Sequence, residues 1–160
     1  MRILSLDAST KKTGWCIIQD GQYIESGIID LHTDKNGEHR LCEMMRSIGF
    51  LILNKTPDKV FLEETTLASN AAILRVLAQL GGFIKGYCYC RKVPIEMIYP
   101  TTWRSIVGIK EGAKVKREEL KEQALVKCKE LLNLTVPEDE AEACLIALAA
   151  CNRGNDDEEN

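Results

Sequence analysis

The sequence predicts an α/β protein with a five-stranded mixed sheet flanked by helices, in which three antiparallel strands are followed by two parallel strands. Two patterns in the 160 residues predict this architecture. Three runs rich in apolar residues follow one another at the start of the chain, separated only by turn-sized gaps. Beyond residue 37, apolar runs alternate with longer segments in which apolar residues recur every three or four positions. Successive hairpins followed by alternating helices and strands are typical of a mixed sheet covered by helices.

The first half of the predicted sheet is a meander of three strands, at residues 2–8, 13–19 and 22–30. Asp20 and Gly21 separate the second strand from the third, and an Asp-Gly pair between two apolar runs is a strong hairpin signal. A polar stretch then leads into a helix over about residues 38–54.

The second half alternates strands with helices. We expect strands at 58–63 and 94–99, and helices at 70–90, 102–107, 115–132 and 137–151. Asn70 stands where the N-cap of the second helix is expected. Crossovers into the fourth and fifth strands should be right-handed. In this topology the first and fourth strands are neighbours at the centre of the sheet.

The composition is that of one independently folding domain, which we place at residues 1–152, followed by a disordered acidic tail at 153–160. No apolar stretch approaches the roughly 20 residues of a membrane span, and the first residues lack the pattern of a secretory signal. Seven cysteines without a C-x-x-C pair favour a reducing compartment over a disulfide framework. We therefore expect a cytoplasmic protein that does not associate with membranes.

Positive charge is concentrated in one part of the chain, although the net charge is −3. Residues 85–130 carry eleven Lys and Arg against six Asp and Glu. Such an excess can follow the phosphates of a nucleic acid, although a solvated helix face has the same composition. The candidate phosphate contacts are Lys11, Lys12, Arg104, Lys110, Lys114, Lys116, Arg117 and Lys121.

Four acidic residues stand at the ends of predicted elements. Asp7 ends the first apolar run and Glu63 ends the fourth, while Asp139 and Glu142 lie three apart at the start of the last helix and share one face. Burying such carboxylates costs free energy that a partner must recover. Mg²⁺ prefers oxygen ligands, and two ions held by four carboxylates can hydrolyse a phosphodiester. The pattern predicts a site for two Mg²⁺ or Mn²⁺ ions.

Each of these acids also has a purely structural explanation. Asp7 can cap the turn that follows it, and Asp139 and Glu142 can interact with the helix dipole. Glu63 and Glu64 can form a solvated strand exit, although strand alternation allows only one of them to point inward. The joint occurrence of all four acids favours the metal site.

Three segments resemble RuvC-type Holliday junction resolvases of the RNase H-like superfamily. They are residues 3–15, residues 62–64 followed by Asn70, and residues 139–143, and the similarity covers about residues 1–152. The resemblance implies an RNase H-like fold and a homodimer that binds a four-way DNA junction and makes two symmetrical nicks, in a bacterial cell or a phage-infected host. It also implies a catalytic tetrad of Asp7, Glu63, Asp139 and Glu142, with Lys114 or Lys116 near the scissile phosphate.

Two positions depart from the family pattern. Glu142 stands where the family usually has Asp, and Thr66 stands where an aromatic residue commonly stacks on unpaired bases. The second departure is consistent with a phage-type member of broader specificity that also cuts forks or flaps.

The second helix is the expected dimer interface. It is apolar almost all round, and its glycines would let another backbone approach closely. The family uses this helix for dimerisation, and the corresponding residues here are Leu77, Leu80, Gly82, Ile84 and Gly86. A buried core helix crossing the sheet would have the same pattern.

Other functions are compatible with parts of the pattern. Asp-x-Ser-Thr after a strand also resembles the phosphate loop of actin-like ATPases and sugar kinases, which need two such domains and about twice this length. The sequence is also compatible with two other functions. One is a structured-RNA processing nuclease of the same fold, and the other is a non-catalytic junction-binding relative.

Overall fold

The strands form one mixed sheet with the order β3-β2-β1-β4-β5. The computed structural model describes residues 1–65 and 70–157, with side chains described to residue 153. The strands are β1 (Arg2–Asp7), β2 (Lys12–Gln19), β3 (Gln22–Asp30), β4 (Lys59–Glu63) and β5 (Ile95–Ile98). β1 pairs antiparallel with β2 and parallel with β4, while β2 and β3 are antiparallel and β4 and β5 are parallel. The predicted fold class is confirmed.

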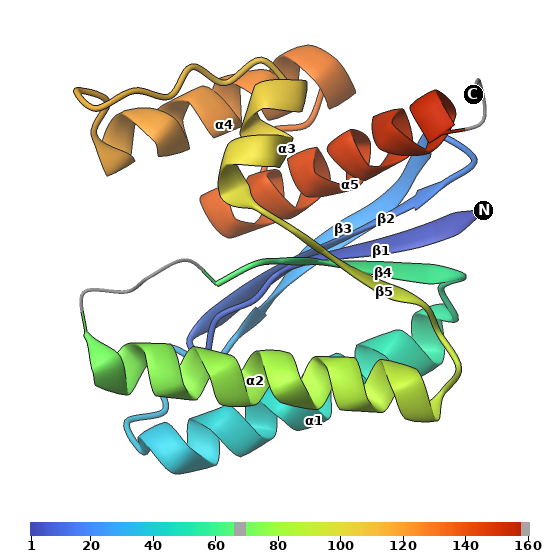
Figure 1. Ribbon diagram of the computed structural model, residues 1–160. Helices are drawn as coiled ribbons and strands as arrows, with labels where there is room; N and C mark the ends of the chain where they lie inside the picture. Colours follow the sequence, from blue (N-terminus) through green and yellow to red (C-terminus); the bar gives the residue numbers. More distant parts are fainter. Residues whose placement is uncertain (66–69, 158–160) are drawn as a thin grey trace.

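Helices cover both faces of this sheet (Figure 1). They are α1 (Gly37–Lys55), α2 (Ala71–Cys90), α3 (Pro100–Ile106), α4 (Arg117–Leu132) and α5 (Glu138–Asp157). α1 and α2 lie on one face, whereas α5 lies on the other with α3 and α4 beside it. Each face therefore has its own apolar core. In the part of the chain that the structure describes, no helix is both long and apolar enough to cross a membrane.

The structure contains the hairpin turn and the helix cap that the sequence predicts. Asp20 and Gly21 have φ angles of 50° and 77°, the left-handed conformation that a two-residue type I′ hairpin turn requires at both positions. The Asn70 side chain accepts a hydrogen bond of 2.8 Å from the backbone N–H of Ala72 and caps α2.

α5 approaches the sheet very closely. The buried side chains of its inner side are mostly small, namely Ala141, Ala143, Cys144, Ala147, Ala149 and Ala150. A Cβ atom placed on Gly14 of β2 would lie only 1.8 Å from the backbone oxygen of Asp139, so only glycine fits there. The buried Ser5 hydroxyl of β1 donates a hydrogen bond of 2.6 Å to the backbone oxygen of Ala143. These contacts fix the first turns of α5 over β1 and β2.

Several element boundaries differ from those predicted. α3 begins at Pro100, whose fixed φ angle suits the first turn of a helix, rather than at 102. α4 begins two residues later than predicted, at Arg117. α5 continues to Asp157, beyond the end predicted at 151, so residues 153–157 extend the helix where a disordered tail was expected. Residues 158–160 lie outside the described part of the chain.

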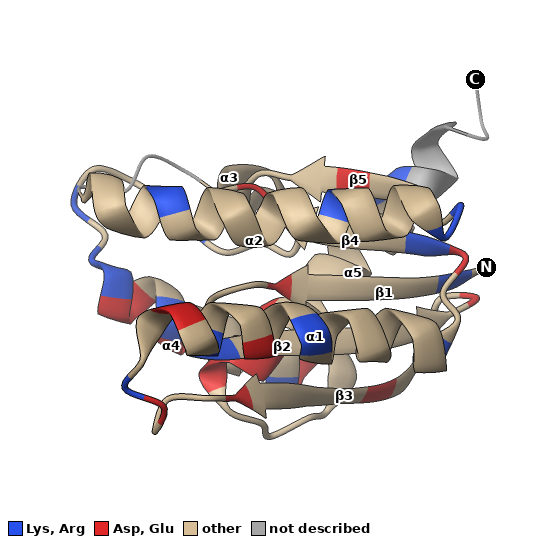
Figure 2. Cartoon of the chain, turned by 90° about the horizontal axis from the view of Figure 1, so that it is seen from below, with Lys and Arg blue, Asp and Glu red and all other residues tan. Residues whose placement is uncertain are grey.

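The structure also corrects the assignment of α2 residues to a dimer interface. Leu80 and Ile84 are buried in the core between α2, α1 and the sheet, because their helical spacing places them on the inner side of α2. Gly82 and Gly86 are exposed, and Leu77 is half-buried. Figure 2 shows that α2 carries few charged residues along its length. The outer side of α2 is therefore the part available to a partner.

Candidate active site

Asp7 and Glu63 lie at the same edge of the sheet, at the ends of its two central parallel strands. Leu6 of β1 is the register partner of Leu62 of β4. The next residue of each strand is the acid, so the two carboxylates leave adjacent strands side by side, as predicted from the topology. β5 extends this edge, because Ile98 is the register partner of Glu63.

α5 brings the other two acids to this edge. Gly14 is paired with Asp7 across β1 and β2, and the Asp139 backbone lies directly over Gly14. The carboxyl group of Glu142, one turn further along α5, is within hydrogen-bonding reach of that of Asp7. The sheet and the first turns of α5 thus gather all four predicted acids.

The carboxyl groups share a strongly negative environment. The pKa of Asp7 is raised well above its usual value, first by burial and then by the charges of Glu63, Glu142 and Asp139. Burial also raises the pKa of Glu63 to about 7, an effect opposed by a hydrogen bond from Trp103. The pKa values of Asp139 and Glu142 are raised mainly by burial as well. Burial and mutual repulsion therefore disfavour the charged forms of these four carboxyl groups.

Two consecutive residues of α3 contact this cluster. The indole Nε1–H of Trp103 donates a hydrogen bond of 2.6 Å to Oε2 of Glu63. The guanidinium of Arg104 lies 3.7 Å from Oε1 of Glu142 and pairs at 2.8 Å with Glu111 in the loop before α4. Each contact compensates part of the charge of one acid.

The donor set suits a hard divalent cation, but its members are not arranged as a finished coordination shell. Among the described residues, no group of three His, Cys, Asp or Glu side chains has the geometry to hold an ion. Glu142 is turned toward Asp7 and Arg104, and Glu63 toward Trp103. Four carboxylates with raised pKa values nevertheless provide the oxygen ligands and negative charge that Mg²⁺ and Mn²⁺ require. The four residues would hold such a cation through their carboxylate oxygens.

The basic residues predicted to bind phosphates fall into two groups. Five are exposed, on the loop between β1 and β2, the loop before α4 and the start of α4, namely Lys11, Lys110, Lys114, Lys116 and Arg117. The other three have acidic partners. Lys12 lies 3.5 Å from Asp30, Lys121 pairs with Glu138, and Arg104 is held as described above. The exposed group can meet a nucleic acid without breaking an ion pair seen here.

Two residues of this site were missed by the sequence analysis. Trp103 contacts an acid forty positions earlier in the chain, and no spacing pattern links them. The sequence did offer one signal, because Trp103 follows a predicted strand and Pro100. A buried indole N–H there needs a hydrogen-bond acceptor nearby. Gly14 lies within the first segment that resembles the RuvC family, but its role depends on the close approach of α5, which no sequence pattern indicates. Thr66, the predicted departure from the aromatic position, lies outside the described residues.

Comparison with known proteins agrees with this geometry. The family model described as crossover junction endodeoxyribonuclease RuvC matches residues 3–152. The chain belongs to the RuvC family. RuvC from Hydrogenovibrio crunogenus is 30% identical over 156 residues, which cover 94% of this chain and 86% of that protein. RuvC from Agrobacterium fabrum is 24% identical over 98% of this chain and 92% of its own.

Solved RuvC structures have the same fold. Thermus thermophilus RuvC in complex with a Holliday junction substrate superposes with a TM-score of 0.76 at 14% identity, covering 97% of this chain and 96% of that one. A fowlpox virus resolvase in complex with Holliday junction DNA superposes with a TM-score of 0.67 at 20% identity, covering 96% and 98%. Thermus thermophilus RuvC and the fowlpox virus resolvase therefore share this arrangement of sheet and helices.

Proposed function

We propose that this chain is a Holliday junction endonuclease that hydrolyses phosphodiesters with two Mg²⁺ or Mn²⁺ ions held by Asp7, Glu63, Asp139 and Glu142. The observation that supports this function best is the convergence of four half-buried acids with raised pKa values at one edge of the sheet. RuvC family membership supports the DNA junction as substrate, as do the junction complexes of two structural relatives.

The four acids have different surroundings and therefore different roles. The charges of the other three acids all act on Asp7, so Asp7 would hold a cation together with them. Glu63 and Glu142 have partners in α3, whereas Asp139 depends on the contact of α5 with Gly14. When bound, the ions activate a water and stabilise the leaving oxygen. The chain's own contribution is to hold the ligands in place and to bind the phosphates beside them.

The exposed lysines of the loop before α4 are proposed to bind the DNA backbone. Lys114 and Lys116 are exposed, a few residues after the loop residue Glu111, which Arg104 connects to the acidic cluster. Neutralising phosphates releases counterions, so binding should weaken steeply with salt. Either lysine is a candidate for the position near the scissile phosphate.

We also propose a homodimer formed through the outer side of α2. A Cβ added to Gly81, Gly82 or Gly86 would meet no heavy atom within 4 Å, so this side is open to a partner's backbone. α2 carries only two charged residues, Arg75 and Lys85. Two copies related by symmetry would place two active sites on one junction, as paired nicking requires.

The decisive experiment uses three synthetic substrates: a four-way junction, a replication fork and a plain duplex. Each is incubated with Mg²⁺, Mn²⁺ or EDTA and analysed for nicks on every strand. The proposed function predicts paired symmetrical nicks in the junction that require the metal and are absent with Asp7→Asn. Equal cleavage of fork and junction would assign broader specificity, and cleavage of structured RNA but not of DNA would replace the proposal. Junction binding without any cleavage would identify a non-catalytic relative.

A further inference from the structure

Trp103 is placed beside the acidic cluster by the fold itself. Ile98 of β5 pairs with Glu63, and α3 begins at Pro100, immediately after β5. The first turn of α3 therefore rises next to the end of β4. Trp103 is fully buried there, at 0% exposure.

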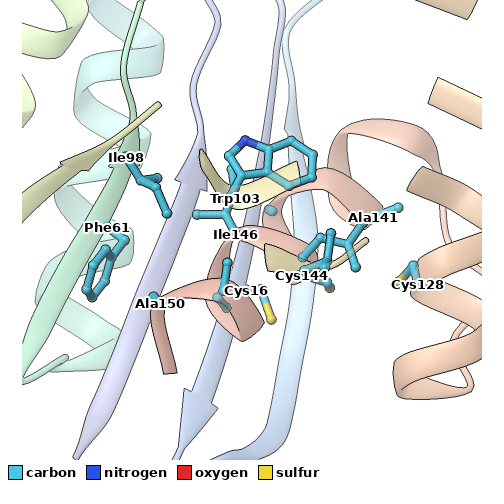
Figure 3. Close-up of a cluster of buried hydrophobic side chains, with 14 of the residues drawn as sticks. Cys16, Phe61, Ile98, Trp103, Cys128, Ala141, Cys144, Ile146 and Ala150 are labelled. Atoms are coloured by element: carbon cyan, nitrogen blue, oxygen red, sulfur yellow. The ribbon is translucent and has the colours of Figure 1, made fainter. Parts of the chain in front are cut away.

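Packing holds the indole ring in a single orientation. Figure 3 shows Trp103 beside Ile146 of α5, within the cluster that also contains Ile98. The guanidinium of Arg104 lies over the ring, 5.1 Å from its centre. A ring enclosed in this way presents its N–H in one direction only.

The hydrogen bond between Trp103 and Glu63 is one that neither partner can readily replace. A buried indole N–H left without an acceptor destabilises the fold, and Oε2 of Glu63 accepts from it at 2.6 Å. The donor is neutral and cannot titrate, so it directs the carboxylate without competing with a cation for its charge. Arg104 differs in this respect, because its positive charge faces Glu142.

We propose that Trp103 is a positioning residue for the cleavage reaction, which fixes Oε2 of Glu63 and turns the other oxygen toward a bound cation. This proposal rests on the proposed role of Glu63 as a metal ligand. Outer hydrogen bonds to metal-binding carboxylates typically contribute 10- to 100-fold to metal affinity. Trp103 would act through Glu63 and touch neither the ion nor the DNA.

The first test uses the fluorescence of Trp103 itself. The chain has two tryptophans, and Trp15 lies on β2, half-buried and next to Lys55. The Trp15→Phe protein therefore reports on Trp103 alone. We expect its emission to change saturably with Mg²⁺, and the midpoint to move to higher Mg²⁺ when Glu63→Gln is added. Emission that stays constant over the Mg²⁺ range in which calorimetry detects binding would overturn the proposal.

The second test removes the donor and keeps the ring. Trp103→Phe, and replacement of Trp103 by benzothienylalanine, which has sulfur in place of the N–H, should each raise the Mg²⁺ dissociation constant measured by calorimetry by about 10- to 100-fold. Nicking of a junction should recover at saturating Mg²⁺, which a general packing defect would not allow. Trp15→Phe is the matched control and should bind Mg²⁺ like the wild type. If Trp103→Phe does not fold, the near-isosteric analogue and the fluorescence test decide.

The same measurements distinguish this proposal from the proposed function. If Glu63→Gln leaves the Mg²⁺ affinity unchanged, Glu63 is not a ligand and the proposed metal site fails. If Glu63→Gln weakens binding while both Trp103 replacements bind like the wild type, only the role of Trp103 is refuted.

Discussion

Glu63→Gln should stabilise the metal-free protein at the same time as it removes a metal ligand. Burial raises the pKa of Glu63 from 4.5 to about 7, so the folded chain holds a proton there that the unfolded chain releases. The folded state binds more protons between those two values, and its stability therefore falls as the pH rises through this window. Gln is neutral at every pH and keeps an oxygen to accept the hydrogen bond from Trp103.

The magnitude follows from the shift of the Glu63 pKa. At about 1.4 kcal/mol per pH unit, a rise from 4.5 to about 7 corresponds to roughly 3 kcal/mol at pH 8. Glu63 is half-buried and shares protons with its neighbours, so we expect a gain of about 1–3 kcal/mol in the free energy of unfolding. For a chain of this size, that gain raises the Tm by about 3–9 °C.

The assay is thermal unfolding followed by circular dichroism in EDTA, at pH 8 and pH 5. Glu63→Gln should exceed the wild type in Tm at pH 8, and the difference should shrink at pH 5, where the wild-type carboxyl is protonated. Glu64→Gln removes a charge one residue away and serves as the matched control. A Glu63→Gln protein no more stable than Glu64→Gln at pH 8 would refute the inference that Glu63 lies in a destabilising negative cluster.

Three further substitutions test other parts of the structure. Gly14→Ala would place a Cβ 1.8 Å from the Asp139 backbone oxygen and so displace the start of α5. Calorimetry should then show that Mg²⁺ binding is lost, and thermal unfolding should show a free energy of unfolding about 1–3 kcal/mol lower. Gly37→Ala, the control, should show neither effect. Replacing Lys114 and Lys116 together by Ala should weaken junction binding and reduce the slope of log affinity against log salt by roughly 2; an unchanged slope would exclude both as phosphate contacts. Gly86→Arg should shift the protein from dimer to monomer in analytical ultracentrifugation, and a dimer that persists would place the interface elsewhere.

The sheet and the position of the acids could be predicted because local signals determine them. The Asp-Gly turn fixes the β2–β3 hairpin, and the mixed-sheet topology expected from the order of strands and helices makes β1 and β4 neighbours. Once those strands are adjacent, Asp7 and Glu63 must emerge together. Predicting the sheet was therefore enough to predict that two of the four acids lie side by side.

The features that sequence analysis missed depend on packing between distant elements. The Trp103–Glu63 hydrogen bond joins residues of two elements that have no shared periodicity. The inner and outer sides of α2 could not be separated in an almost wholly apolar helix, so Leu80 and Ile84 were assigned to an interface although they belong to the core. The end of α5 was also misplaced, because acidic residues near a C-terminus indicate disorder by composition alone.

Four carboxylates from β1, β4 and α5 are proposed to hold divalent cations at one edge of the sheet. Anomalous diffraction from crystals soaked in Mn²⁺ would locate those cations. We expect two manganese peaks, both with carboxylate oxygens of Asp7, Glu63, Asp139 or Glu142 as ligands, and loss of at least one peak with Asp7→Asn. Wild-type crystals in which Mn²⁺ is bound elsewhere, with none between these side chains, would refute the metal site.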